Sequence, residues 1–181
     1  MTVKPNNIFL TGFSTSGKTT LGRKLAQKLK MKFYDTDSLI EKMEGRSIAA
    51  IFREDGEKYF RAVESDVIRQ VISRRGRKVV ALGGGAYHCR RNRDLIAPAG
   101  TVIYLSCSVA ELYRRLKNKK DRPLLALKGE EKADKNTIRT LLDRRKDNYN
   151  KADYRVATTS KSVTLSINKI VDKVKNARNQ D

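Results

Sequence analysis

One segment, residues 7–29, restricts the possible folds of this chain more than any other. It opens with a short apolar, β-rich run, Asn7–Gly12, and continues into Lys18–Leu29, whose apolar residues recur at helical spacing. Between the two, Gly12–Thr19 reads GFSTSGKT and fits the pattern GxxxxGK[ST]. A glycine-rich loop joining a strand to a helix in this way is typical of proteins built on a parallel sheet. The segment therefore predicts an α/β fold.

The same loop predicts a phosphate site. Its glycines allow the backbone N–H groups to turn inward around phosphate oxygens, and the following helix directs its positive N-terminus at them. Lys18 would reach the β- and γ-phosphates, while the Thr19 hydroxyl would hold Mg²⁺. The alternative, a glycine turn that only starts a helix, would require neither the lysine at position 18 nor the hydroxyl at position 19. The residues expected to contact ATP here are Gly12, Ser14, Thr15, Ser16, Gly17, Lys18, Thr19 and Thr20.

The rest of the chain alternates between strand and helix patterns. Further strands are predicted at 32–34, 79–82, 101–105 and 154–158, and helices at 38–43, 47–53, 55–74, 109–116, 137–149 and 163–174. Residues 117–131 are polar, contain Pro123 and Gly129, and are expected to form a loop. Alternation of this kind predicts a mostly parallel sheet covered by helices on both faces, and 181 residues suit a single domain.

The charge of the chain is strongly positive. It has 40 Lys and Arg against 20 Asp and Glu, a net charge of +20, although residues 35–75 alone are balanced, with 8 basic and 9 acidic side chains. A polyanion is the expected partner, and the total leaves nucleic acid, an anionic membrane surface and a phosphorylated small molecule open. No apolar run approaches the roughly 20 residues of a membrane span. The N-terminus lacks the apolar core of a signal peptide, and two cysteines form no CxxC pair, so we expect a cytoplasmic protein.

A second motif, Asp35-x-Asp37, follows the predicted strand at 32–34. Its carboxylates should lie at the carboxyl end of that strand, where open α/β sheets bind ligands. One of the two carboxylates can orient metal-bound water while the other takes the proton of a reacting hydroxyl. Asp35 is a candidate metal residue together with Thr19. The alternative is that Asp37 only caps the helix at 38–43.

Four more short motifs follow in order: Phe60-Arg61-x-x-Glu64, the run Gly83–Gly85, Arg122-Pro123-Leu124-Leu125, and Arg145-x-x-x-Tyr149. Joined to the phosphate loop and the paired aspartates, they make residues 6–175 resemble the shikimate kinase family. The resemblance implies a P-loop, nucleoside-monophosphate-kinase-like fold of three layers, with a five-stranded parallel sheet in the order 2-3-1-4-5. It also implies a substrate-binding region at about 35–75 and a lid at about 117–131.

That resemblance implies an activity and roles for single residues. The activity is transfer of the ATP γ-phosphoryl group to the 3-hydroxyl of shikimate, a step of aromatic amino-acid (chorismate) biosynthesis, by a monomer with Mg²⁺. Arg145 is preferred to its neighbour Arg144 by the family spacing to Tyr149. The implied roles are Asp37, Lys18 and Arg122 in catalysis; Asp37, Arg61, Gly83, Gly84, Gly85 and Arg145 on shikimate; Arg115, Arg122 and Lys161 on the nucleotide; and Glu64 in orienting Arg61.

Other interpretations remain open from the sequence. A gluconate kinase or nucleotide kinase would share the architecture, and a nucleic-acid-binding module with an idle phosphate loop would explain the charge. We expect small-molecule partners, shikimate and ATP, with no membrane and no specific nucleic acid. The single histidine, His88, is expected to begin a surface helix rather than act as a base, and Cys89 and Cys107 are expected to be packing residues. The chain departs from common family residues at Leu82, Asp147 and Val163.

Overall fold

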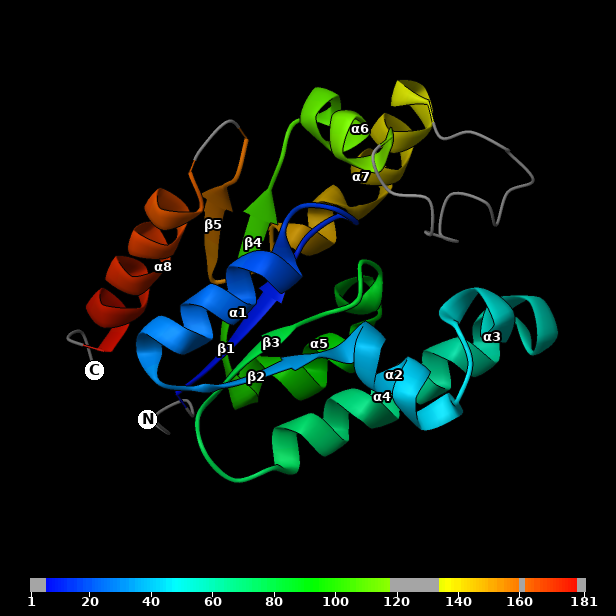
Figure 1. The fold of residues 1–181 in the computed structure, drawn as a ribbon, viewed down its shortest axis with the longest axis horizontal. Helices are drawn as coiled ribbons and strands as arrows, with labels where there is room; N and C mark the ends of the chain where they lie inside the picture. The colour runs from blue at the N-terminus through cyan, green and yellow to red at the C-terminus, as the bar shows by residue number, and fades with distance from the viewer. Residues whose placement is uncertain (1–5, 118–133, 160–161, 179–181) are drawn as a thin grey trace.

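The protein is built on one five-stranded parallel sheet. A computed structural model describes residues 6–117, 134–159 and 162–178. The strands stand in the order β2-β3-β1-β4-β5, as predicted, and every neighbouring pair is parallel (Figure 1). Their bounds are β1 Asn7–Thr11, β2 Lys32–Asp35, β3 Lys78–Ala81, β4 Gly100–Ser106 and β5 Tyr154–Ala157.

Helices connect successive strands. The predicted helices are confirmed within a few residues. The structure also has three short helices, η1, α5 and η2, which the sequence periodicity did not predict. His88 ends η1 instead of beginning a helix, and α5 starts two residues later. The bounds are α1 Lys18–Leu29, α2 Thr36–Glu44, α3 Ile48–Glu54, α4 Gly56–Ser73, η1 Ala86–His88, α5 Arg90–Ile96, η2 Ala97–Ala99, α6 Val109–Lys117, α7 Lys135–Tyr149 and α8 Val163–Arg178.

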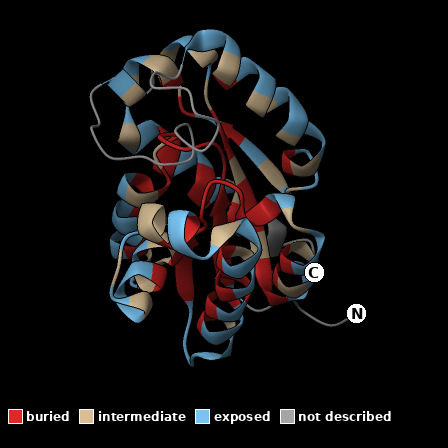
Figure 2. Ribbon diagram, turned by 90° about the vertical axis from the view of Figure 1, so that its right-hand side faces the viewer, coloured by how far each residue is buried: buried red, intermediate tan, exposed pale blue. Residues whose placement is uncertain are grey.

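The two faces of the sheet bury alternate residues of each strand, as the period of a strand requires. Ile8 and Leu10 of β1 pack beneath α1 and α8, whereas Phe9 faces the opposite layer, which holds α4, α5 and part of α7. All three side chains are fully buried, and burying each stabilises the fold by about 1.5–3 kcal/mol. Figure 2 shows this buried centre between helices whose outer surfaces are exposed. The fold is therefore the predicted three-layer arrangement.

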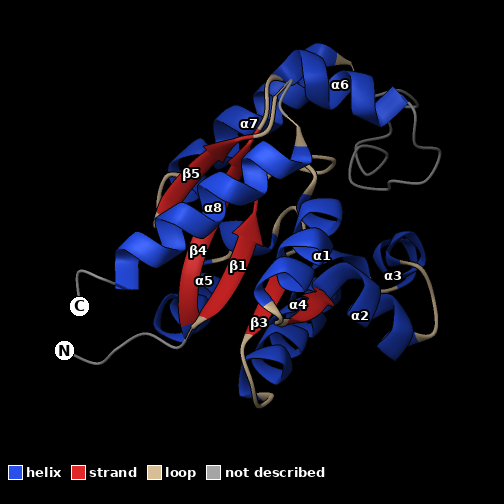
Figure 3. Ribbon diagram, turned by 60° about the vertical axis from the view of Figure 1, so that its left-hand side comes forward, coloured by secondary structure: helices blue, strands red, loops and turns tan. Residues whose placement is uncertain are grey.

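Because all strands are parallel, their carboxyl ends lie along one edge of the sheet, called here the carboxyl edge (Figure 3). The phosphate loop follows β1, Asp35 ends β2, and the glycine run Gly83–Gly85 follows β3. Since β2, β3 and β1 are adjacent, three motifs that are far apart in the sequence meet at this edge. The opposite side, where the strands begin, is called the amino edge.

None of the described helices is both long enough and apolar enough to cross a membrane. Two predicted nucleotide residues, Arg122 and Lys161, lie outside the described residues, as does nearly all of the predicted lid at 117–131.

Candidate active site

The phosphate loop is held together by its own lysine. Gly17, which precedes α1, has φ 100°, a left-handed conformation that favours glycine. Lys18 is only 8% exposed, and its Nζ donates to the carbonyl oxygens of Gly12 at 2.8 Å and Phe13 at 2.9 Å. The ammonium group therefore lies at the centre of the loop, at the N-terminus of α1.

A cleft of about 410 Å³ opens beside this loop, lined by Thr15, Ser16, Gly17, Lys18, Thr19, Thr20, Leu21, Asp35, Asp37, Leu82, Arg114, Arg115, Thr158, Val163 and Ser166. Arg115, the predicted adenine contact, forms part of its wall. Its guanidinium donates to the carbonyls of Thr15 at 3.2 Å and Thr158 at 3.0 Å, and to Glu111 at 2.7 Å. Arg115 thus joins the phosphate loop to the end of β5.

Thr158 was not predicted from the sequence. Its hydroxyl donates to the carbonyl of Ser16 at 3.1 Å, which is a contact across 142 positions of the chain. No local pattern signals such a contact, since a single threonine after a strand is common. It fixes the back of the phosphate loop from the β5 side.

Thr19 and Asp35 form the pair expected for a metal. The Thr19 hydroxyl donates to Asp35 Oδ2 at 2.6 Å, while Asp35 Oδ1 accepts from the backbone N–H groups of Asp37 at 3.1 Å and Ser38 at 3.4 Å. The helix cap is therefore Asp35 and not Asp37, so the capping alternative for Asp37 is wrong. Among the described residues no cluster of three or more His, Cys, Asp or Glu side chains could form a complete metal site. One hydroxyl and one carboxylate suit Mg²⁺, which keeps several waters and phosphate oxygens as ligands.

The carboxylates of Asp37 and Glu64 converge on Gly83. A Cβ added at this glycine would lie 2.6 Å from Asp37 Oδ1 and 2.8 Å from Glu64 Oε1, so a larger residue would displace both carboxylates. The Gly83 N–H donates to the Thr36 hydroxyl at 2.8 Å, so this amide already has a partner inside the protein. An amide for a ligand would therefore come from Gly84 or Gly85, and Thr36 is a supporting residue that the sequence did not reveal.

The buried Glu64 accepts a hydrogen bond from Arg61. Arg61 donates to Glu64 Oε2 at 2.9 Å and to the exposed Glu57 at 3.0 Å, and a Cβ at Gly85 would lie 2.8 Å from its guanidinium. Glu64 is 0% exposed, and burial raises its pKa to about 7 even though Arg61 acts in the opposite direction. Glu64 Oε1 is buried with no hydrogen-bond partner among the described groups. The geometry agrees with the prediction that Glu64 orients Arg61.

Arg145 and Tyr149 meet on the other side of the glycine run. The Arg145 guanidinium and the Tyr149 hydroxyl both donate to the carbonyl of Gly84, at 3.1 Å and 2.9 Å. Arg145 also lies over the ring of Phe13 in the phosphate loop, 5.7 Å from its centroid. Burial raises the pKa of Tyr149 to about 12, so its hydroxyl keeps its proton. Arg144, in contrast, is exposed, so the structure brings Arg145 and not its neighbour to the site.

The sequence model of the family described as shikimate kinase matches residues 14–175. A shikimate kinase of Chlorobium chlorochromatii is 43% identical over 178 residues, which cover 96% of this chain and 93% of that protein. The chain belongs to the shikimate kinase family. A solved shikimate kinase of Acinetobacter baumannii in complex with shikimate superposes with a TM-score of 0.88 and 34% identity, over 96% of this chain and 94% of that one.

Other kinases share the architecture only. A gluconokinase of Sinorhizobium meliloti superposes with a TM-score of 0.61 and 18% identity, over 98% of each chain, a likeness that shows the fold alone. Shikimate kinase relatives, in contrast, match this chain in sequence along nearly its whole length. Family membership therefore favours shikimate over gluconate as the acceptor.

The single histidine, His88, is exposed and contacts α7. His88 Nδ1 is 2.7 Å from the Asn148 side-chain nitrogen on α7, a contact in which the amide donates to a neutral ring. Burial and the nearby Arg145 lower the pKa of His88 below its ordinary value. Both cysteines are half-buried and free, and Cys107 packs against the cluster of Phe13, Leu112 and Ile138. The contact of Cys107 agrees with the packing role predicted for it.

Proposed function

We propose that this protein transfers the γ-phosphoryl group of ATP to the 3-hydroxyl of shikimate, releasing shikimate 3-phosphate and ADP. Family membership supports the activity. The observation that carries the mechanism is the convergence of Asp37, Arg61 and Arg145 on one glycine run, directly beside the phosphate loop. A hydroxyl acceptor and a carboxylate clamp next to a triphosphate site are the parts that this reaction requires.

The nucleotide half of the reaction depends on positioning and neutralisation of charge. Lys18, now held by two loop carbonyls, would exchange them for the β- and γ-phosphate oxygens. Arg115 would hold the adenine side of the cleft, and Lys161 would add a further contact. Arg122 would close over the phosphates with the lid at 117–131. Exclusion of water by this closure would limit hydrolysis of ATP.

Mg²⁺ is the metal that the oxygen donors of Thr19 and Asp35 suit, and when bound it supplies positive charge to the phosphate oxygens. Thr19 would contribute its hydroxyl oxygen and Asp35 its Oδ2, or a water held there. The Asp35 Oδ1 would continue to cap α2, so the same carboxylate fixes the start of the helix that carries Asp37.

The residues that would bind shikimate orient two of its groups, the reacting hydroxyl and the carboxylate. Asp37 would accept the hydrogen bond of the 3-hydroxyl and, as transfer proceeds, its proton. Arg61 and Arg145 would grip the substrate carboxylate through paired N–H donors, which match a planar anion. Because Glu64 and the Gly84 carbonyl already hold these arginines, little reorganisation is needed when the substrate binds.

The same proposal covers the organisation of the chain. We expect residues 1–181 to act as one kinase domain and as a cytoplasmic monomer, with residues 35–75 as the substrate-binding region. Size-exclusion chromatography with light scattering would test the monomer directly, and a mass near 41 kDa, about twice the 20.6 kDa of the chain, would overturn it.

A coupled assay of ADP release tests the acceptor. The wild-type protein is expected to turn over with shikimate and to give no more than background rates with gluconate or nucleoside monophosphates. Lys18→Met, which removes the ammonium from the phosphate loop, should abolish the activity and so exclude a contaminating kinase. Turnover with gluconate equal to that with shikimate would contradict the proposed acceptor.

A further inference from the structure

The amino edge of the sheet carries a dense group of positive side chains that the kinase site does not use. Lys30 and Lys32 flank the start of β2, and Arg74, Arg75 and Arg77 lie in the loop between α4 and β3; we call these five residues the amino-edge basic surface. All five are exposed. The Lys32 N–H donates to the Arg77 carbonyl at 3.2 Å, so the two loops lie side by side.

The loop between α4 and β3, which carries Arg74, Arg75 and Arg77, is held in place by the buried Lys78. Lys78 is only 2% exposed, and its ammonium donates to the carbonyls of Ile72 and Arg74 at the end of α4. The Lys78 N–H in turn donates to the buried Asn7 side chain at 3.2 Å. A buried lysine that ties a helix end to a strand fixes the backbone of the loop. The three guanidinium groups therefore project from an ordered base.

Acidic residues are missing from the sequence around this surface. Residues 18–34 and 67–93 contain no Asp or Glu. Within the described parts of the chain, no ion pair joins any of the five side chains to a carboxylate. Arg74 instead lies over the half-buried ring of Tyr34, 5.0 Å from its centroid. The positive charge is thus not neutralised within the described structure.

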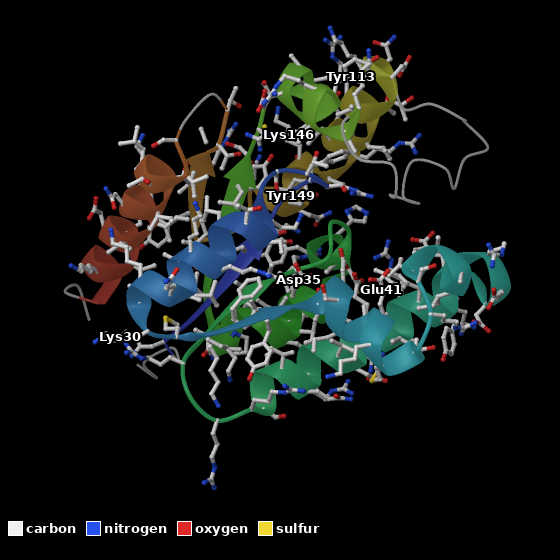
Figure 4. The ribbon with its side chains drawn as sticks, in the orientation of Figure 1. Lys30, Asp35, Glu41, Tyr113, Lys146 and Tyr149 are labelled. Atoms are coloured by element: carbon white, nitrogen blue, oxygen red, sulfur yellow. The ribbon has the colours of Figure 1, made fainter. Side chains whose placement is uncertain are left out.

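Steering of ATP does not account for this surface. Lys18 and Lys30 lie at opposite ends of α1, a helix of 12 residues that spans about 18 Å. That distance is more than twice the Debye length of about 8 Å at physiological salt, so the field of the surface is largely screened at the phosphate loop. In Figure 4, Lys30 lies at the lower left, well away from Asp35 at the carboxyl edge. A ligand of this surface would leave the kinase cleft open.

We propose that the amino-edge basic surface binds the phosphate backbone of nucleic acid, without regard to sequence. Three guanidinium groups and two ammonium groups on adjacent loops match a run of phosphates, and arginine pairs its N–H donors with phosphate oxygens. Among described residues the exposed large apolar side chains, Met43, Tyr59 and Leu165, lie on α2, the first turn of α4 and α8. The surface therefore offers no apolar anchor for a membrane.

Fluorescence anisotropy of the full-length protein tests this proposal. The probes are a labelled 24-nucleotide single-stranded RNA and a 24-base-pair DNA duplex, each of mixed sequence and titrated from 50 to 200 mM KCl. The variant Arg74→Gln/Arg75→Gln/Arg77→Gln removes three charges of the surface. A matched control, Lys42→Gln/Lys58→Gln/Lys151→Gln, removes three exposed charges elsewhere, and both variants are checked for wild-type circular dichroism and thermal stability.

The wild-type protein should bind both probes with micromolar Kd at 50 mM KCl and a log–log salt slope of about −4 on the duplex, since each neutralised phosphate contributes about −0.9. The arginine variant should bind at least tenfold more weakly, with a slope smaller by about 3. The control should stay within threefold of wild type. No binding by the wild type, or equal losses in both variants, would overturn the proposal. Tighter binding to phosphatidylserine vesicles than to either probe would assign the surface to membranes instead.

Discussion

The two edges of the sheet both concentrate basic side chains but hold them in different ways. At the carboxyl edge, Lys18, Arg61 and Arg145 are partly or largely buried, and each is bonded to a carbonyl or carboxylate of the protein. At the amino edge, Arg75 and Arg77 are exposed, in a stretch of the chain without acidic residues. The same residue types are therefore restrained at one edge and unrestrained at the other.

This difference matches the size of the anion that each edge would bind. A guanidinium fixed by Glu64 or by the Gly84 carbonyl has one orientation, which suits a small planar carboxylate. Exposed side chains adapt to a long, regular polyanion and bind it mainly by releasing counterions.

Replacement of Asp37 should have the largest effect. Asp37→Asn keeps the shape of the side chain but cannot accept the proton of the shikimate hydroxyl, so kcat should fall about 10³-fold, within the range of a general base. The affinity for ATP should change little. Steady-state kinetics would measure both, with Asp66→Asn on the exposed face of α4 as the matched control. Turnover near the wild-type rate would remove Asp37 from the mechanism.

The buried carboxylate at the carboxyl edge should make folding depend on pH. The pKa of Glu64 is about 7 in the folded protein, above its ordinary value of 4.5, so its ionisation opposes folding. Its contribution to stability is present below pH 4.5 and is lost as the pH rises through 7. Relative to Glu64→Gln, the wild-type free energy of unfolding should fall by about 3 kcal/mol between pH 4.5 and 8. Urea denaturation across this range measures it, and parallel curves for the two proteins would contradict the assignment.

The carboxylate clamp should distinguish two adjacent arginines. Arg145→Lys removes the paired N–H donors and should raise the KM for shikimate about 30-fold, equivalent to about 2 kcal/mol for a charged hydrogen bond. Arg144→Lys, one position away and exposed, should leave KM unchanged. An equal change of the KM for shikimate in both variants would contradict the role of Arg145 in binding the substrate carboxylate.

The smallest effect is expected at the amino edge. At 150 mM KCl the triple variant of Arg74, Arg75 and Arg77 should keep kcat and both KM values within twofold of wild type, because screening separates this surface from the cleft. At 20 mM KCl the Debye length of about 20 Å allows a larger change. The ADP-release assay at 20 and 150 mM KCl measures this. A loss of kcat/KM for ATP at both salt concentrations would show that the two edges are coupled.

Much of the fold was predictable because its elements carry strong periodic patterns. The strand order came from the family resemblance, and the long helices from their apolar spacing. The short α5 was not predicted, because its two apolar residues, Leu95 and Ile96, are adjacent and show no helical spacing. The assignment of the cap to Asp35 or Asp37 also required the structure, because both carboxylates stand at the start of α2.

Within the site, local motifs identified the groups that face the ligands, whereas their supports came from distant parts of the chain. Thr36 accepts from Gly83, and Thr158 donates to Ser16, contacts that span 47 and 142 positions. The role of Lys78 was equally hidden, because its partners are carbonyls at the end of α4. Such supports depend on how the elements pack, which a single sequence does not specify.

By our proposal, the carboxyl edge transfers a phosphoryl group to shikimate instead of to water. Phosphorus-31 NMR of the purified protein with ATP, Mg²⁺ and shikimate distinguishes these two outcomes. We predict loss of the γ-phosphate signal with the matching rise of a single phosphomonoester that correlates with the proton on carbon 3 of shikimate. Accumulation of inorganic phosphate with no phosphomonoester would contradict the account.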